Sequence, residues 1–179
     1  KVINFGPLQY GQTKNFILEF EKPLSHQQLE VFVSFKDYRN NTNFNCVVKN
    51  QLSTDNSINV HYLRSNMLST VEQCMDLLAN YNDDSSSVAN TILNGYISTI
   101  RTFETVFPNK YLSDLMKDLA GQTTLALSKR EWYSRWGCHY IRSLTLAHMN
   151  QQCNNFKDPG VQHFGGELFS KIRDMADDI

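Results

Sequence analysis

The chain is 179 residues long, with 41% hydrophobic residues, 20% charged residues and a formal net charge of −1. This is ordinary globular composition for one or two domains, and a chain of this size can bury about 70% of its unfolded surface. Because there is no basic excess, the sequence argues against a nucleic-acid partner. No apolar run approaches the ~20 residues needed to cross a bilayer, which argues against membrane insertion.

The four cysteines are too few and too scattered for a disulfide framework. They are Cys46, Cys74, Cys138 and Cys153. We interpret them as reduced, mostly buried small hydrophobic residues of an intracellular, cytoplasmic protein. The chain begins without Met on a strand-like stretch and stops just after a helical pattern. We therefore expect it to be a segment of a longer polypeptide.

Residues 1–64 alternate apolar and polar side chains in short runs, as β-strands do. Polar turns rich in Asn, Ser and Asp separate some of these runs. The five expected strands are 2–5, 15–21, 29–36, 44–49 and 57–63. No crossover helix lies between them, so the sequence predicts an antiparallel β-sandwich or half-sandwich.

From about Ser65 the apolar residues recur at helical spacing. The five expected helices lie around residues 67–79, 88–103, 111–119, 128–147 and 168–176. The fourth begins at Ser128, which with Glu131 has the spacing of a capping box. Short loops favour antiparallel neighbours. The predicted fold class is therefore α+β, with a β-sandwich subdomain at 1–64 followed by an antiparallel α-helical bundle of about five helices at 65–179.

Cysteine, histidine and tryptophan crowd into residues 132–166, which raises the question of a metal site. Zinc sites use ligand pairs at short spacing so that two donors converge. Cys138 and His139 would point apart on a helix. Cys138 and His148 would lie ~80° apart around the axis and ~15 Å apart along it. We therefore expect no metal and no other cofactor.

Two further chemistries are weakly supported by the sequence. A nearby histidine could activate Cys138 or Cys153, but there is no local signature and neither cysteine lies at an obvious helix N-terminus. Backbone N–H groups at Gly165 and Gly166 could hold an anion at the start of the last helix. The glycine patterns of nucleotide sites are absent, however, and such glycines are often steric. We expect no catalytic residue and no small-molecule substrate.

The aromatic residues Trp132, Trp136 and Tyr140 fall on one helical stripe, which is more often core than a ligand platform. Tryptophan and tyrosine also anchor protein interfaces. Arg135 and His139 lie on another face, which is either solvated or a basic patch for a partner protein. The residues predicted to contact a protein partner are Trp132, Arg135, Trp136, His139 and Phe156.

Residues 154–160 form a polar loop that ends in Asp158-Pro159-Gly160. This sequence is typical of a turn, because proline fixes φ and glycine permits positive φ. We expect the loop to fold back on the preceding helix, with Phe156 and Phe164 as its anchors.

The C-terminal third contains a series of distinctive motifs: W-Y-S-R-W-G-C-H-Y (132–140), L-A-H (146–148), Q-C-N-N-F-K-D-P-G-V-Q (152–162), G-G-E-L-F (165–169) and A-D-D-I (176–179). Together these motifs resemble the VWaint domain. The VWaint domain follows a von Willebrand factor A (VWA) domain in large intracellular proteins. The resemblance is most specific over 128–179. Neither the D-x-S-x-S metal motif of A domains nor an intein-type splice-junction cysteine is present, so no metal or catalytic residue is carried over.

The resemblance implies a non-enzymatic structural and protein-interaction module that supports an adjacent A domain of the same chain. Protein partners are then expected. The alternative is an accessory domain of a ubiquitin ligase or of an autoprocessing, Hint-type precursor, because related chains sometimes carry RING, U-box or Hedgehog/intein-like domains. A weaker alternative is a peptide groove that uses strand addition at 14–21 or 57–63.

Overall fold

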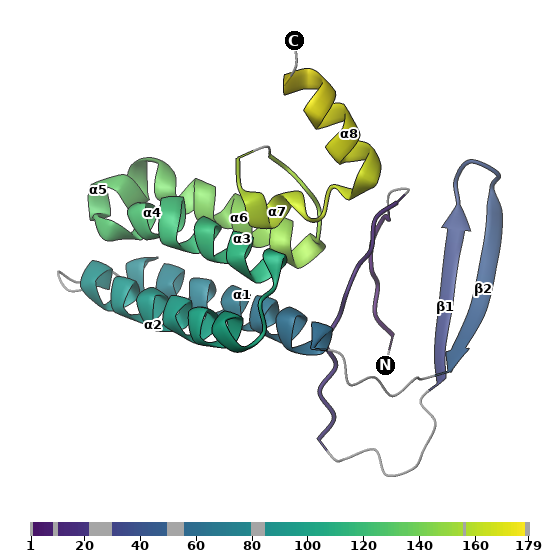
Figure 1. Ribbon diagram of the computed structural model, residues 1–179, viewed down its shortest axis with the longest axis horizontal. Coiled ribbons are helices and arrows are strands. Elements are labelled where there is room, and N and C mark those ends of the chain that lie inside the picture. Colours follow the sequence, from purple (N-terminus) through teal and green to yellow (C-terminus); the bar gives the residue numbers. More distant parts are fainter. Residues whose placement is uncertain are drawn as a thin grey trace. The chain divides into compact units, whose positions relative to one another are not determined.

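The computed structural model describes residues 2–8, 11–21, 30–49, 56–79, 85–155 and 157–177. The chain divides into two compact units, one made of residues 1–17 with 56–179 and the other of residues 18–55. The described part of the first unit is mainly helical, and the second holds a β-hairpin (Figure 1).

The hairpin consists of β1 (Glu30–Asp37) and β2 (Thr42–Lys49), which pair antiparallel. Phe35 and Phe44 are opposite each other in the register and stack with ring centroids 5.1 Å apart. The turn is polar, and Asn41 adopts a φ of 52°, which asparagine tolerates better than most residues. The strands predicted at 29–36 and 44–49 are confirmed to within one or two residues.

The predicted β-sandwich is wrong. Within the described residues the strands form a single two-stranded sheet, whereas a sandwich requires two packed sheets. Residues 2–5 and the described 15–21 form no strand, and residues 57–63 lie in a helix. The chain is mostly helical, so a β-sandwich subdomain at 1–64 followed by a five-helix bundle does not describe it.

Two long helices, α1 (Ser57–Ala79) and α2 (Ser85–Val106), lie side by side in one layer (Figure 1). Their buried residues recur three or four positions apart, which is why this sequence forms helices here. The buried apolar residues are Val60, Leu63, Met67, Val71, Cys74 and Leu78 on α1, and Ala89, Leu93, Ile97 and Ile100 on α2. The Tyr96 hydroxyl donates to the Leu63 carbonyl and joins the two helices.

A second layer of shorter elements covers this pair (Figure 1). In chain order these are α3 (Lys110–Asp118), η1 (Leu119–Thr123), α4 (Thr124–Ser128), α5 (Arg130–Trp132), η2 (Tyr133–Gly137) and α6 (Cys138–Asn150). Helices α3 and α4 pack on α2, and α6 packs on α1. Asn109 starts α3, because its Oδ1 accepts from the backbone N–H groups of Tyr111 and Leu112 at 2.9 and 3.3 Å.

The helix predicted over 128–147 begins two residues later than predicted, at Arg130, and continues through α5, η2 and α6 to Asn150. Helix α4 ends at Ser128, and Lys129 is extended (φ −143°, ψ 143°) before α5. The predicted capping box does not form, because the Ser128 hydroxyl donates back to the Leu125 carbonyl at 2.8 Å. The π-helical turn η2 then shifts the phase of the side chains ahead of α6.

After α6 the chain reverses through a short helix, α7 (Pro159–Gln162), and ends in α8 (Gly166–Asp177). The C-cap of α6 is Gln151, which has a left-handed φ of 52°. The side chain of Gln151 then accepts from the backbone N–H of Asn15 at 2.6 Å and donates to its carbonyl at 2.9 Å. This pair of bonds fixes the N-terminal segment against the end of α6.

Candidate functional site

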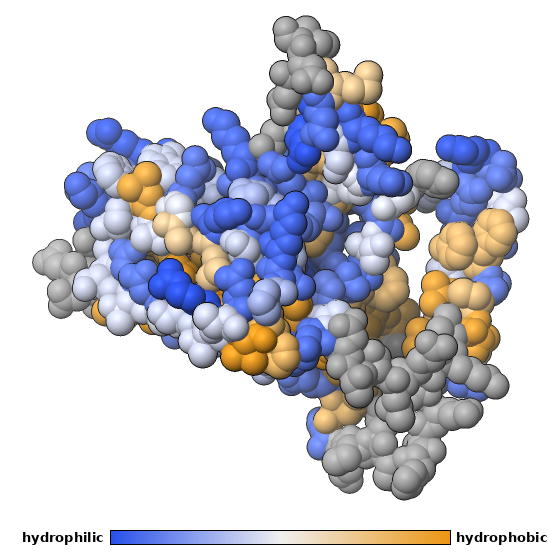
Figure 2. All heavy atoms as spheres, in the orientation of Figure 1, coloured by the Kyte–Doolittle hydropathy of each residue, from blue (hydrophilic) through white to orange (hydrophobic). Residues whose placement is uncertain are grey.

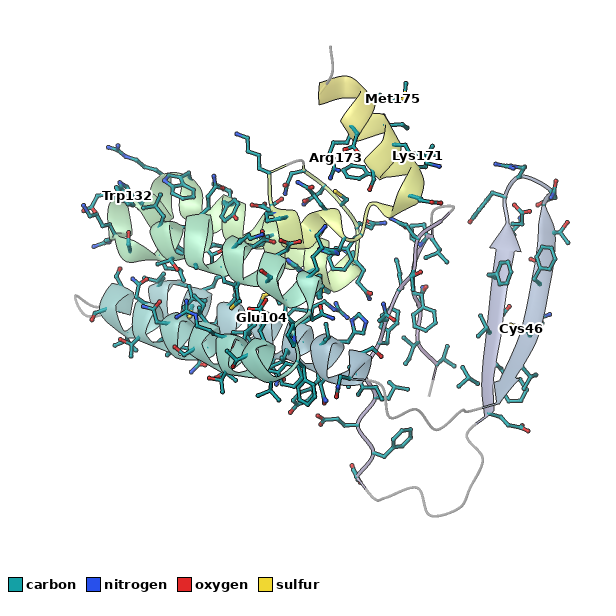
Figure 3. The ribbon with its side chains drawn as sticks, in the orientation of Figure 1. Cys46, Glu104, Trp132, Lys171, Arg173 and Met175 are labelled. Carbon is teal, nitrogen blue, oxygen red and sulfur yellow. The ribbon has the colours of Figure 1, made fainter. Side chains whose placement is uncertain are left out.

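The five residues predicted to contact a partner have different environments. Arg135 and His139 are exposed. Trp132 is half-buried at the end of α5, with the Lys129 Nζ 4.8 Å from its ring centroid (Figure 3). Trp136 is half-buried against the core and lies 5.9 Å from the Tyr140 ring. Phe156 lies outside the described residues, and the role of all five stays a prediction.

The polar segment after α6, residues 151–158, forms what we call the return loop. The Asn155 Oδ1 accepts from the backbone N–H groups of Lys157 and Asp158 at 3.0 and 2.9 Å. Its Nδ2 donates to the Asp158 Oδ2 at 2.8 Å. The Tyr140 hydroxyl of α6 donates to the Asp158 Oδ1 at 3.0 Å. The asparagine and aspartate of the motif therefore hold the loop to the helix before it.

Glycine at position 160 is required by the close approach of α7 to α3. A Cβ atom at Gly160 would lie 2.4 Å from the Asp118 Oδ2 and 3.1 Å from the Leu115 Cα. Real Cβ atoms essentially never approach another atom as closely as the first of these distances, and the second is tighter than most real Cβ contacts. The Asp158-Pro159-Gly160 turn thus has two roles. Its aspartate accepts a hydrogen bond from Tyr140 of α6, and its glycine allows the chain to pack directly on α3.

A buried polar cluster lies beneath this contact. His148 and Asp118 are both fully buried, and the His148 Nε2 is 3.6 Å from the Asp118 Oδ2, longer than a hydrogen bond. The Tyr111 hydroxyl lies 3.3 Å from the His148 Nδ1. Burial lowers the pKa of His148 and raises that of Asp118, so the neutral form of each is favoured. Phe164, a predicted anchor, is buried edge-on to both His148 and Tyr111.

Arg64 is a second buried polar residue, only 5% exposed, on the inner face of α1. Its Nη1 donates to the His148 carbonyl and its Nη2 to the Asn15 carbonyl, both at 2.7 Å. Within the described residues no carboxylate forms an ion pair with it, and its Nε has no hydrogen-bond partner. A guanidinium keeps its proton in proteins, so Arg64 brings a buried positive charge that these carbonyls only partly stabilise.

A pocket of about 300 Å³ opens beside this cluster. It is bounded by the N-terminal segment, by the first turns of α1 and α3, and by the junction of α7 with α8. Its lining residues are Gly11, Gln12, Thr13, Asn15, Ser57, Val60, His61, Asn109, Tyr111, His163, Phe164 and Gly166. None of these described lining residues is acidic, so the pocket presents imidazoles, amides and hydroxyls together with a few apolar groups.

The two histidines of the pocket flank the Tyr111 ring. The ring centroid of Tyr111 is 5.1 Å from that of His163 and 6.4 Å from that of His61. The His163 Nε2 lies 2.9 Å from the Asp114 Oδ2, which orients its ring. The His61 Nδ1 is buried and has no hydrogen-bond partner in the described part of the chain. Burial, and then the charge of Arg64, lower the pKa of His61.

Helix α8 has an apolar face that is not covered in the described structure. Leu168, Ile172 and Met175 recur at intervals of four and three residues and are 59%, 58% and 70% exposed. Figure 2 shows hydrophobic atoms on α8 at the top of the view. Arg173 is turned towards the return-loop side and donates to the Gln162 Oε1 at 2.7 Å, whereas Lys171 and Met175 point away (Figure 3). The helix is therefore held at its polar side.

The cysteines are all unpaired, but only Cys74 is fully buried, so the expectation that most of them are buried is wrong. Cys46 is exposed, and Cys138 and Cys153 are half-buried. Burial raises the pKa of the Cys153 thiol, which donates to the Asn155 carbonyl at 3.2 Å. A raised pKa disfavours the thiolate that a nucleophile needs.

The sequence reasoning missed Arg64, His61 and Asp118. Arg64 carries a signal that could have been found, because it lies four residues after Val60 and three before Met67 on the buried stripe of α1. A charged residue on an apolar stripe indicates a buried polar contact. Asp118 carries a similar signal, because it follows the buried Leu115 by three residues on α3. His61 carries none, because its ring contact with Tyr111 joins residues fifty positions apart in the chain.

The comparisons with known proteins found one family that matches the C-terminal part of the chain. A model of the Vwaint family, described as VWA / Hh protein intein-like, matches residues 109–178. The resemblance inferred from the motifs is therefore confirmed over the stretch from the start of α3 to the end of α8. No curated protein and no solved structure matches the chain. None of the described helices is long and apolar enough to span a membrane.

Proposed function

We propose that the chain is a non-catalytic, protein-binding module that supports an adjacent VWA domain of the same polypeptide. The observation that carries the proposal is the Vwaint match at 109–178, which includes an uncovered apolar helix face on α8. The family description associates these residues with VWA proteins. The expected partner is therefore a VWA domain.

The shape of the α8 face suits a helix-in-groove contact. Three aliphatic side chains on one face are the usual anchors of an amphipathic helix that docks on a hydrophobic groove. Burying one such side chain stabilises a complex by about 1.5–3 kcal/mol. The bond between Arg173 and Gln162 holds α8 on the side opposite to this face.

The predicted surface around Arg135 and His139 is a second contact area for the same function. Both side chains are exposed, and they lie on η2 and α6 rather than on α8. If alanine at both positions leaves every protein captured by the parent polypeptide unchanged, that surface assignment is wrong.

The proposal is tested by calorimetric titration of the 179-residue chain with the A domain of its parent polypeptide. We expect Ile172→Glu to weaken binding by about tenfold or more, as loss of an interface anchor does. The matched control is Leu146→Glu, which places the same charge at an aliphatic residue of α6 that is 54% exposed. Equal affinities for the two variants, or no binding by the unaltered chain, would contradict the proposal.

The alternative function is an accessory domain of an autoprocessing precursor. The term "Hh protein intein-like" in the family description favours it. The binding module and the autoprocessing precursor are distinguished by incubating the purified parent polypeptide and following its molecular mass over time. Self-cleavage that depends on residues 109–178 would favour the alternative, whereas an intact chain that still binds its A domain supports the accessory module.

A further inference from the structure

We propose that the pocket between the N-terminal segment, α1, α3 and α8 binds a carboxylate. The pocket has the size of a small ligand site, at about 300 Å³, and combines apolar walls with converging polar groups. This proposal does not rest on the α8 interface, because the two sites use different residues.

Positive charge lies behind the α1 wall of the pocket, whereas His163 on another wall is bonded to the Asp114 carboxylate. Arg64 follows His61 by one turn of α1, and the pKa of His61 is lowered first by burial and then by the charge of Arg64. Its guanidinium is buried without an ion pair in the described part of the chain. The first turns of α1, α3 and α8 also border the pocket, and helix N-termini carry partial positive charge. An anion in the pocket would offset a buried charge that is otherwise costly.

The hydrogen-bonding groups of the pocket include one that lacks a partner. The Nδ1 of His61 is buried with no hydrogen bond in the described structure, and the His61 side chain lines the pocket. The Nδ1 atom is itself buried, so a carboxylate oxygen would accept a hydrogen bond from it once a rotation of the ring turns the atom into the pocket. His163, on the other side of Tyr111, is oriented by Asp114 and supplies a second imidazole.

A carboxylate fits the lining better than a phosphate does. Phosphates are typically held by several Arg or Lys side chains, and none of the described lining residues is Arg or Lys. Val60, Tyr111 and Phe164 instead provide apolar surface for the carbon atoms that carry a carboxylate. The group could come from a dissolved carboxylic acid or from an acidic residue of a peptide.

The test follows the imidazole resonances of the 179-residue chain by NMR at neutral pH. The probes are acetate, the capped peptide acetyl-Ala-Asp-Ala-amide, its Asn counterpart and inorganic phosphate. We expect acetate and the Asp peptide to shift the His61 and His163 signals and the Asn peptide not to shift them. Tighter binding of the Asp peptide than of acetate indicates a peptide ligand, and tighter binding of acetate indicates a dissolved acid. Both results support the proposal. Binding of phosphate more tightly than both would overturn it.

Two variants and a control complete the experiment. His61→Phe keeps an aromatic ring but removes the nitrogen, and we expect it to weaken carboxylate binding about tenfold or more. Thr13→Leu places a larger apolar side chain at an exposed lining residue and should have the same effect. His139→Phe changes an exposed imidazole on α6 and should bind as the unaltered chain does. Unchanged binding by both pocket variants, or shifts of His139 equal to those of His61, would overturn the proposal.

Discussion

The return loop and α8 are close in the chain, and both lie within residues 109–178, yet they are opposite in character. In the return loop, the polar groups of Asn155 and Asp158 are bonded to each other and to Tyr140. In α8, the apolar side chains are exposed, and a polar anchor, Arg173, holds the helix. The difference suggests that the loop motif maintains the fold whereas the helix is available for binding. Substitutions should therefore destabilise the chain strongly in the loop and weakly on α8.

The largest expected loss is at Gly160. In Gly160→Ala the added methyl group would collide with Asp118 and Leu115, and overpacking of this kind costs about 1–3 kcal/mol. The control is Gly95→Ala in α2, where a Cβ would meet no atom within 4 Å and the better helix propensity should add about 1 kcal/mol. Urea denaturation measures both. Equal stability of the two variants would refute the close packing of α7 on α3.

A smaller loss is expected at Tyr140. Tyr140→Phe removes the hydroxyl that donates to Asp158, which should lower the free energy of unfolding by about 1.5 kcal/mol. Tyr133→Phe is the matched control, because Tyr133 is half-buried and no hydrogen bond of its hydroxyl occurs in the described part of the chain. In thermal denaturation, Tyr140→Phe should have a lower melting temperature than Tyr133→Phe. If both variants unfold alike, the bond between Tyr140 and Asp158 does not stabilise the loop.

The buried histidine beneath the loop should make stability depend on pH. The pKa of His148 is lowered by burial, so below about pH 6.5 the unfolded chain binds a proton that the folded chain does not. Stability should then fall as pH is lowered from 7.5 towards 6, by at most about 1.4 kcal/mol per pH unit for this group. At lower pH Asp118 has the opposite effect on stability. Because its pKa is raised in the folded chain, its carboxylate binds a proton at a higher pH in the folded chain than in the unfolded chain.

The measurement is a series of denaturation curves over this pH range. His148→Gln should flatten the decline, although it also lowers stability at every pH. The control substitution is His139→Gln, which removes an exposed histidine of α6. A steeper decline in His148→Gln than in the unaltered chain would mean that His148 is not held neutral.

The smallest effect on stability is expected on α8. Ile172 is more than half exposed, so Ile172→Glu should change the free energy of unfolding by less than about 0.5 kcal/mol. The same variant is the one expected to lose the partner. A loss of 2 kcal/mol or more would show that this face is covered within the folded chain and is not a free surface.

The sequence predicted the helical stretches better than the N-terminal part, for a physical reason. Residues 57–63 alternate like a strand, but Val60 and Leu63 also begin a buried helical stripe that continues for five turns in α1. The longer pattern prevails because it buries more surface. Phe16, Leu18 and Phe20 alternate too, but in the described residues no neighbouring strand pairs with them, and all three are exposed. Alternation alone does not specify a sheet.

The return loop could be predicted in part and the pocket could not. Asp158-Pro159-Gly160 indicates a turn from its own chemistry, and the prediction that the loop folds back on α6 agrees with the bond to Tyr140. The pocket depends on Thr13, His61 and His163, which come from three separate segments of the chain. Such proximity follows from tertiary packing, for which a single sequence gives no local signal.

The most direct test of the account is amide hydrogen exchange of the 179-residue chain, alone and with the A domain of its parent polypeptide. Alone, amides of α6 and α7 should exchange far more slowly than those of α8, because the return-loop contacts bury them. With the A domain added, protection should appear in α8, over residues 166–177. Protection of α8 in the free chain equal to that of α6, or no change in α8 on adding the A domain, would contradict it.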